Sequence, residues 1–178
     1  MIEEQAIIEN IINGDIESFR LLVERYQKPV IRMINNIVND NHICEDVAQD
    51  VFLSAYKKLA TFDNTQSRFS TWLFTIARNK SLNTIKKRKI PASDELSEIA
   101  DNKQTGDEFE KQEFLNALDR QLNLLPKRQK TVFVLAEFEK LPYEQIAQIE
   151  GINIGTMRTR LHRAKRKLAK ALSLDWEI

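Results

Sequence analysis

Apolar residues recur at helical spacing along most of the chain, and in its first half they predict about four helices. A short amphipathic helix precedes Gly14, and Asp15 can cap the second helix, in which Pro29 is expected to introduce a kink. A third helix is predicted over about 43–59 and a fourth over about 70–87, with a loop at 60–67 between them. The second helix is predicted to bury Phe19, Leu22, Val23, Tyr26, Val30, Ile34 and Ile37, and the third Val47, Val51, Phe52, Ala55, Tyr56 and Leu59.

The second half of the chain continues the helical pattern after a break. Helices are predicted near 107–124, 127–137, 143–149 and 154–172. The segment 91–107 is polar, contains Pro and Gly, and lacks a sustained apolar period, as is typical of a linker. No internal repeat is visible. The sequence therefore predicts an all-α protein with two small helical domains, residues 1–90 and 108–178, joined by a flexible acidic linker at 91–107.

The stretch 143–168 has the pattern of a helix-turn-helix. Gly151 allows the positive φ of a tight turn, and Asn153 is a good N-cap for the next helix. No acid interrupts residues 155–170, which contain seven Lys or Arg. Such a motif contacts bases with its second helix and phosphates with flanking charges, although a solvated basic helix on an ordinary bundle is the alternative. Met157, Leu161, Ala164 and Leu168 form the predicted buried stripe, and Arg158, Thr159, His162, Arg163 and Arg166 the outward face; Lys165, Lys167 and Lys170 are expected to contact phosphates or solvent.

Composition narrows the class of protein. The chain has 178 residues, of which 42% are hydrophobic and 30% charged, as in ordinary globular proteins. No apolar run reaches membrane-spanning length, and the first residues lack the pattern of a signal peptide, so no membrane insertion is expected. A single cysteine cannot form an internal disulfide, which favours an intracellular, cytoplasmic location.

The net charge of +1 conceals four blocks of alternating sign. Residues 1–63 carry 11 acids and 6 Lys/Arg, whereas 64–93 carry no acid and 7 Lys/Arg. Residues 94–114 carry 8 acids and 2 Lys/Arg, and 115–178 carry 7 acids and 12 Lys/Arg. Two basic surfaces separated by an acidic segment indicate a polyanion bound at two places.

The first basic block also contains aromatic residues, Phe69, Trp72 and Phe74, beside its charges. Aromatic faces can stack on unpaired bases while Lys and Arg follow the backbone. Burial in the core is the more common fate of each aromatic taken singly. The cluster as a whole suggests a surface for single strands, with the helix-turn-helix suited to duplex.

Four sequence blocks, in this order, carry a family resemblance: 19–34, 45–62, 68–79 and 125–168, the third reading RFSTWLFTIARN. Over almost its whole length the chain resembles the bacterial RNA polymerase sigma factors of the extracytoplasmic-function (ECF) type. The resemblance implies a region-two domain that docks on core polymerase and melts the minus-ten element. It also implies a region-four domain that recognises the minus-thirty-five element through the helix-turn-helix.

The resemblance assigns roles to individual residues. Asp46, Gln49 and Asp50 match the polymerase-docking surface. The loop 62–68 matches one that captures a flipped-out base, whose extraction costs a few kcal/mol; Asn64 and Ser67 are candidate contacts to its edge. Asn83 and Thr84 stand where many relatives have Asp and Arg, which affects the fine minus-ten preference. The implied minus-ten contacts are Phe62, Asn64, Ser67, Arg68, Trp72, Arg78, Asn79, Asn83, Lys86 and Lys87, with Trp72 also a candidate core anchor, and the outward face 158–166 supplies the minus-thirty-five contacts.

The resemblance also implies partners: core RNA polymerase, through the β′ clamp helices and the β flap, promoter DNA, and an anti-sigma factor. No cofactor, metal site or catalytic residue is expected. His42 and Cys44 do not supply a zinc site, and Cys44 is expected to be a small buried residue. Glu45, Asp46 and Asp50 are better explained as a solvated helix face than as a metal site. A stand-alone transcription regulator and a DNA-cleaving or recombining enzyme are the alternative hypotheses.

Overall fold

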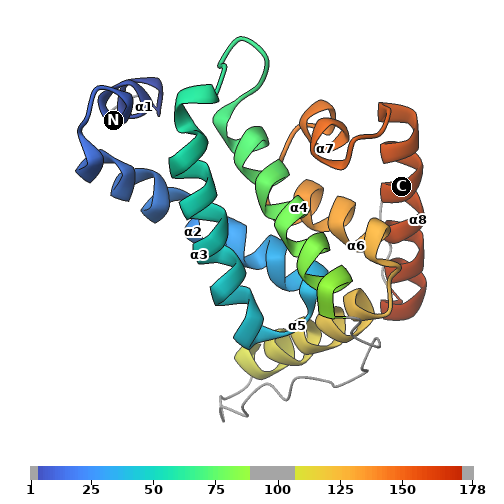
Figure 1. The fold of residues 1–178 in the computed structure, drawn as a ribbon. Helices are drawn as coiled ribbons and strands as arrows, with labels where there is room; N and C mark the ends of the chain where they lie inside the picture. Colours follow the sequence, from blue (N-terminus) through green and yellow to red (C-terminus); the bar gives the residue numbers. More distant parts are fainter. Residues whose placement is uncertain (1–3, 89–106, 174–178) are drawn as a thin grey trace.

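The computed structural model describes residues 4–88 and 107–173, and within these ranges the regular structure is entirely helical (Figure 1). The first group of helices consists of α1 (Glu4–Ile12), α2 (Phe19–Val38), α3 (Asn41–Lys58) and α4 (Phe69–Arg88). Single 3-10 turns at Ile16–Ser18 and Leu59–Thr61 precede α2 and follow α3. The helices α2, α3 and α4 pack against one another, and α1 packs on α2. The predicted all-α class is confirmed.

The second group consists of α5 (Asp107–Asn123), α6 (Lys127–Phe133), α7 (Tyr143–Glu150) and α8 (Ile154–Leu172). The helix predicted near 127–137 is α6 followed by a π-helical segment, Val134–Phe138, in which Glu139 N–H donates to the carbonyl of Val134 at 3.1 Å. Helix α8 packs on α5, α6 and α7. The predicted linker at 91–107 lies outside the described residues except for Asp107, where α5 begins, so its flexibility stays a prediction.

The helix starts follow from local capping chemistry. Asp15 accepts from the Ser18 N–H at the start of the 3-10 turn before α2, and Asp40 accepts from the Ile43 N–H at the start of α3. Asn153 Oδ1 accepts from the Thr156 N–H at 2.7 Å and begins α8. The predicted cap at Asn153 is confirmed, whereas Asp15 caps the 3-10 turn that precedes α2 rather than α2 itself.

The cores largely match the predicted stripes. Leu22, Val30, Ile34 and Ile37 of α2 are buried, and Phe19, Val23 and Tyr26 are partly buried against them. Helix α2 continues through Pro29, and the kink expected there stays a prediction. Tyr56 was predicted to be buried, but it lies at the surface, where its ring makes an edge contact with Phe19.

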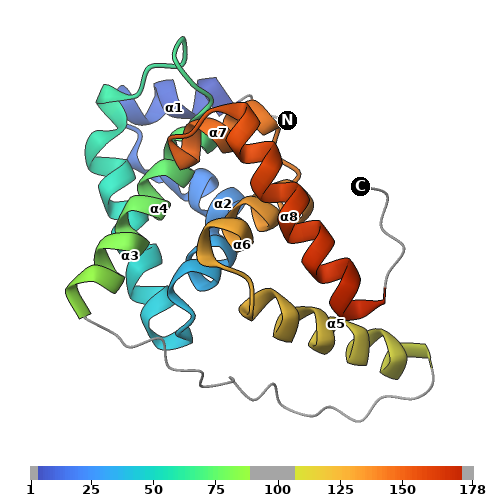
Figure 2. The same ribbon diagram turned by 90° about the vertical axis from the view of Figure 1, so that its right-hand side faces the viewer.

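The two groups of helices pack against each other (Figures 1 and 2). Helix α7 lies along α4 on the side opposite α3, and α2 contacts α6 and the π-helical segment. Helix α8 lies at the outer edge of the molecule, with α6 and α7 between it and the first group (Figure 1). Sequence periodicity carries no information about this packing.

Candidate nucleic-acid interface

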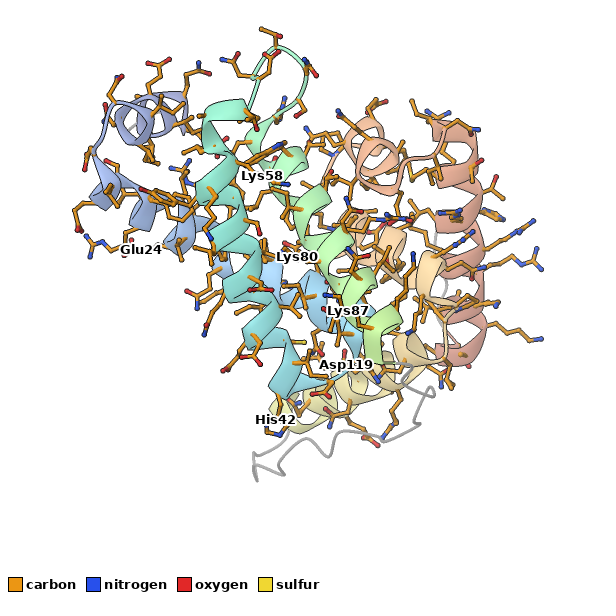
Figure 3. All side chains as sticks on the ribbon, viewed as in Figure 1. Glu24, His42, Lys58, Lys80, Lys87 and Asp119 are labelled. Carbon is orange, nitrogen blue, oxygen red and sulfur yellow. The ribbon has the colours of Figure 1, made fainter. Side chains whose placement is uncertain are left out.

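Helix α8 presents a continuous polar face to solvent. Met157, Leu161, Ala164 and Leu168 are buried, as predicted from their helical spacing. Five polar residues on the other faces are exposed: Arg158, Thr159, His162, Arg163 and Arg166. Figure 3 shows long side chains with nitrogen at their tips projecting outward from this helix. The face therefore presents hydrogen-bond donors at the outer edge of the molecule, where a DNA groove can reach it.

The turn before α8 sets the angle at which this face is presented. Gly151 ends α7 with φ of 63°, the left-handed conformation that the sequence predicted. The Ile152 N–H donates to the carbonyl of Ala147 at 3.0 Å, which satisfies the end of α7. The arrangement α7–turn–α8 has the order and capping of a helix-turn-helix.

Arg160 and Lys165 of α8 do not belong to its outward face. Arg160 Nη1 lies 3.2 Å from Glu150 Oε2 at the end of α7. Lys165 was expected to contact phosphates or solvent, but its Nζ pairs with Glu137 Oε1 at 2.9 Å and its side chain is largely buried. That expectation is wrong for Lys165, because its ammonium forms an ion pair with an acid that is distant in the sequence. Lys167 and Lys170 are exposed, as expected.

The loop that precedes α4 is ordered by its own side chains. The carboxylate of Asp63 accepts from the Thr65 N–H, the Thr65 hydroxyl and the Gln66 amide, and these hydrogen bonds hold the pKa of Asp63 below its usual value. Asn64 donates its amide N–H to Gln5 Oε1 at 2.5 Å, and Gln5 in turn donates to Glu9. Helix α1 therefore supports the loop, a contact that the sequence pattern did not predict.

The aromatic residues of this region form a cluster rather than an open stacking platform. Phe69 and Phe74 are buried, so the structure favours the core role for both. Trp72 and Phe62 are partly buried, and their ring centroids lie 5.4 Å apart. Phe62 also meets Phe69 edge-on at 5.6 Å. Only the partly exposed members, Phe62 and Trp72, have surface left to offer a base.

The charged and amide residues of α4 differ in their surroundings. Asn79, Asn83, Lys86 and Lys87 are exposed, with Lys87 on the near side of α4 in Figure 3, and Arg68 before the helix is also exposed. Ser67 is partly buried. Arg78 is engaged, because its Nε donates to Glu150 Oε1 of α7 at 2.7 Å. The structure thus brings most of the predicted minus-ten residues to one loop and helix, with Arg78 turned toward the second group.

A separate surface lies on α3. Asp46, Gln49 and Asp50 are exposed, while the neighbouring Val47 and Val51 are buried. Leu53, one helical turn beyond Asp50, is 51% exposed, and sequence analysis did not single it out. The distance from Asp50 Oδ2 to Lys80 Nζ of α4 is 3.7 Å. The helix thus presents an acidic, amide-containing face with an apolar residue at its end.

No group of three or more His, Cys, Asp or Glu side chains that could hold a metal ion occurs within 4–88 and 107–173. Cys44 is buried, its thiol lies 3.7 Å from Asn35 Oδ1, and burial raises the thiol pKa, as expected for a small core residue. Among the same residues, no helix has the length and apolar character needed to cross a bilayer.

Two family models match the chain, and they divide it as the helices do. Sigma-70 region 2 matches residues 22–90, and Sigma-70 region 4 matches residues 115–168. The chain is 37% identical over 174 residues to the ECF RNA polymerase sigma-E factor of Haemophilus influenzae, covering 91% of both chains. It is 34% identical to the RNA polymerase sigma-H factor of Pseudomonas aeruginosa, covering 96% of this chain and 94% of that protein.

The chain belongs to the ECF RNA polymerase sigma factors. Proteins of this family direct promoter-specific transcription initiation, and that is the function of this chain. The stand-alone regulator and the DNA-cleaving enzyme are not favoured.

Solved structures show the same fold. The sigma factor RpoE of Bartonella quintana, determined in complex with the anti-sigma factor NepR, aligns with a TM-score of 0.72 and 26% identity over 90% of this chain and 99% of that one. CnrH, determined in complex with the cytosolic domain of CnrY, aligns with a TM-score of 0.69 and 21% identity over 96% of this chain and 97% of that one, which supports the fold alone.

Proposed function

We propose that the two groups of helices divide the work of promoter recognition. Residues 1–90 form the domain that docks on core RNA polymerase and holds the melted minus-ten element, and residues 108–178 recognise the minus-thirty-five element. The observation that carries this proposal is the exposed face of α8, where all five predicted residues from Arg158 to Arg166 lie outside the buried stripe of a capped helix. An Arg on such a face can contact a guanine edge with two hydrogen bonds.

The minus-ten role rests on the loop 62–68 and the exposed face of α4. Asn64 donates one amide N–H to Gln5 Oε1. We propose that its second N–H and its carbonyl oxygen contact the edge of a flipped-out base, together with Ser67. Phe62 and Trp72 supply apolar surface beside that base, and Arg68, Asn79, Asn83, Lys86 and Lys87 follow the strand. Arg78 joins this set only when its ion pair with Glu150 is broken.

The polymerase-docking role falls to the exposed face of α3, for which we expect the β′ clamp helices as the partner. A further partner is an anti-sigma factor, because one solved neighbour is such a complex. The chain carries out no chemistry itself, and it acts in the cytoplasm with the polymerase. The β flap is the expected partner of the second domain.

The docking assignment can be tested by replacing Asp46, Gln49 and Asp50 together with alanine. These side chains are exposed, so the helical fold should be retained while the affinity for core polymerase falls at least about tenfold, or about 1.4 kcal/mol. The matched control replaces Glu9, Glu24 and Gln27, also two acids and a glutamine on exposed helix positions. Titration of labelled protein with core polymerase measures both; equal affinity of the two triple variants would show that α3 is not the docking surface.

A further inference from the structure

One buried carboxylate connects the two groups of helices. Glu150, the last residue of α7, has a side chain that is 3% exposed. Its Oε1 accepts from Arg78 Nε of α4 at 2.7 Å, and its Oε2 lies 3.2 Å from Arg160 Nη1 of α8. A residue of the predicted minus-ten surface and the helix of the predicted minus-thirty-five surface therefore share one acid.

A second ion pair joins the two groups on another pair of elements. Arg32 of α2 and Glu139, which follows the π-helical segment, approach to 2.9 Å between Nε and Oε1, without the geometry of a hydrogen bond. The Glu139 side chain is 7% exposed. The buried apolar residues of both groups also belong to one contiguous cluster. The packing of α4 on α7 and of α2 on α6 thus has both charged and apolar components, and we name it the closed arrangement.

The closed arrangement is incompatible with contact to both promoter elements. Elements centred at minus ten and minus thirty-five lie about 25 base pairs apart, which at 3.4 Å per base pair is about 85 Å along the duplex. In the structure, only the side chain of Glu150 separates Arg78 from Arg160. This incompatibility rests on the proposed function, in which the first domain contacts the minus-ten element and the second contacts the minus-thirty-five element. The domains must then separate before both elements can be bound.

We propose that Glu150 is an autoinhibitory clasp, which holds the free chain closed and withholds Arg78 from the minus-ten strand. The Arg78 side chain is 23% exposed and faces α7, whereas the outward face of α8 stays open to solvent. The clasp can open without leaving a bare charge in the second domain, because Arg160 remains beside Glu150 on its own domain. That arrangement avoids the large penalty of an unpaired buried carboxylate. Binding of polymerase or promoter DNA then only has to supply Arg78 with a new partner in place of Glu150.

The direct test is Glu150→Gln, which keeps an oxygen for Arg160 but removes the charge that attracts Arg78. Glu144→Gln is the matched control, because it makes the same change at an exposed position of the same helix. Small-angle scattering of the free wild-type chain should give a radius of gyration near that of a compact chain of this length, roughly 16 Å. The value should rise for Glu150→Gln and not for Glu144→Gln.

Binding of a labelled, random-sequence, 12-nucleotide single-stranded DNA gives a second readout. If about a tenth of the free wild-type chain is open, freeing Arg78 should tighten binding by up to about tenfold. If Glu150→Gln loses helical content, Arg32→Gln tests the closed arrangement instead. This substitution, at a half-exposed position, weakens the other ion pair between the two groups, that of Arg32 with Glu139. Both substitutions together should open the chain further than either alone.

The proposal is overturned if the folded variants, single and double, all scatter like the wild type and bind the oligonucleotide with its affinity. Failure of the proposed function would look different. In that case the wild-type chain would not support initiation by core polymerase, whereas the scattering comparison involves neither polymerase nor DNA.

Discussion

Lys130 is a charged residue placed inside the second group of helices. It is 6% exposed, and its ammonium donates to Asn123 Oδ1 at 2.6 Å. Burial lowers its pKa to about 8; the carboxylate of Asp119 opposes this shift and the charge of Lys127 adds to it. The protonated form is thus penalised in the folded protein relative to the unfolded chain, where the lysine pKa is about 10.4.

This penalty predicts how stability depends on pH. It is fully present below pH 8 and disappears as the pH rises through 8 toward 10.5, so the free energy of unfolding should rise over that window, by up to about 3 kcal/mol from this group. Lys130→Met should be more stable than the wild type at pH 7 and should lose this part of the pH dependence. Urea unfolding at pH 7 and pH 9.5 measures it, with Lys167→Met, at an exposed position of α8, as the control. Parallel pH slopes for wild type and Lys130→Met would refute the assignment.

Gly151 illustrates which features the sequence determines locally. Its φ of 63° is one that side chains with a Cβ adopt reluctantly, and an added Cβ would meet no heavy atom within 4 Å. The cost of a substitution there is therefore conformational rather than steric. Such a position can be inferred from a glycine between two helical patterns.

Gly151→Ala should accordingly destabilise the second domain by about 1–2 kcal/mol, whereas Gly151→Asn should cost less, because asparagine tolerates the left-handed region. Thermal unfolding followed by circular dichroism compares the two variants with the wild type. If alanine and asparagine are equally damaging, the turn depends on something other than backbone conformation.

At the scale of elements, the helix-turn-helix was predictable because its signals are local. The turn glycine, the Asn153 cap and the buried stripe of α8 all lie within about 20 residues of one another, and α8 begins and ends where the pattern predicts, at 154 and 172. The pairing of Lys165 with Glu137 was not predictable, nor was the bond from Arg78 to Glu150, 72 residues away. Charge patterns along one helix do not indicate which distant acid will pack beside it.

The outward face of α8 leads to a prediction about sequence preference. Alanine at Arg158 or Arg163 should relax discrimination within the minus-thirty-five element by about 1–3 kcal/mol for at least one of the two. Alanine at Lys167 or Lys170 should instead weaken binding to all sequences and flatten its salt dependence. Lys165→Ala should act through folding, because Lys165 pairs with Glu137. Binding to a library of minus-thirty-five variants separates these effects; unchanged preference in both arginine variants would remove them from the base-contacting set.

At the scale of the whole molecule, the chain presents a polar face on α3, an amide- and lysine-rich face on α4 and a basic face on α8. The alternation of charge along the sequence indicated two separate basic surfaces, which the structure places on α4 and α8. It did not indicate that the two groups of helices would pack together, because that contact is made by residues such as Arg32 and Glu139 that no local pattern distinguishes.

If these surfaces act as proposed, this chain gives core RNA polymerase its choice of promoters. The most direct measurement adds the purified chain to bacterial core polymerase with genomic DNA of the source organism as template and maps the 5′ ends of the transcripts. We expect a limited set of start sites, absent with core polymerase alone and preceded by shared minus-ten and minus-thirty-five sequences. A set of 5′ ends identical with and without the chain would contradict it.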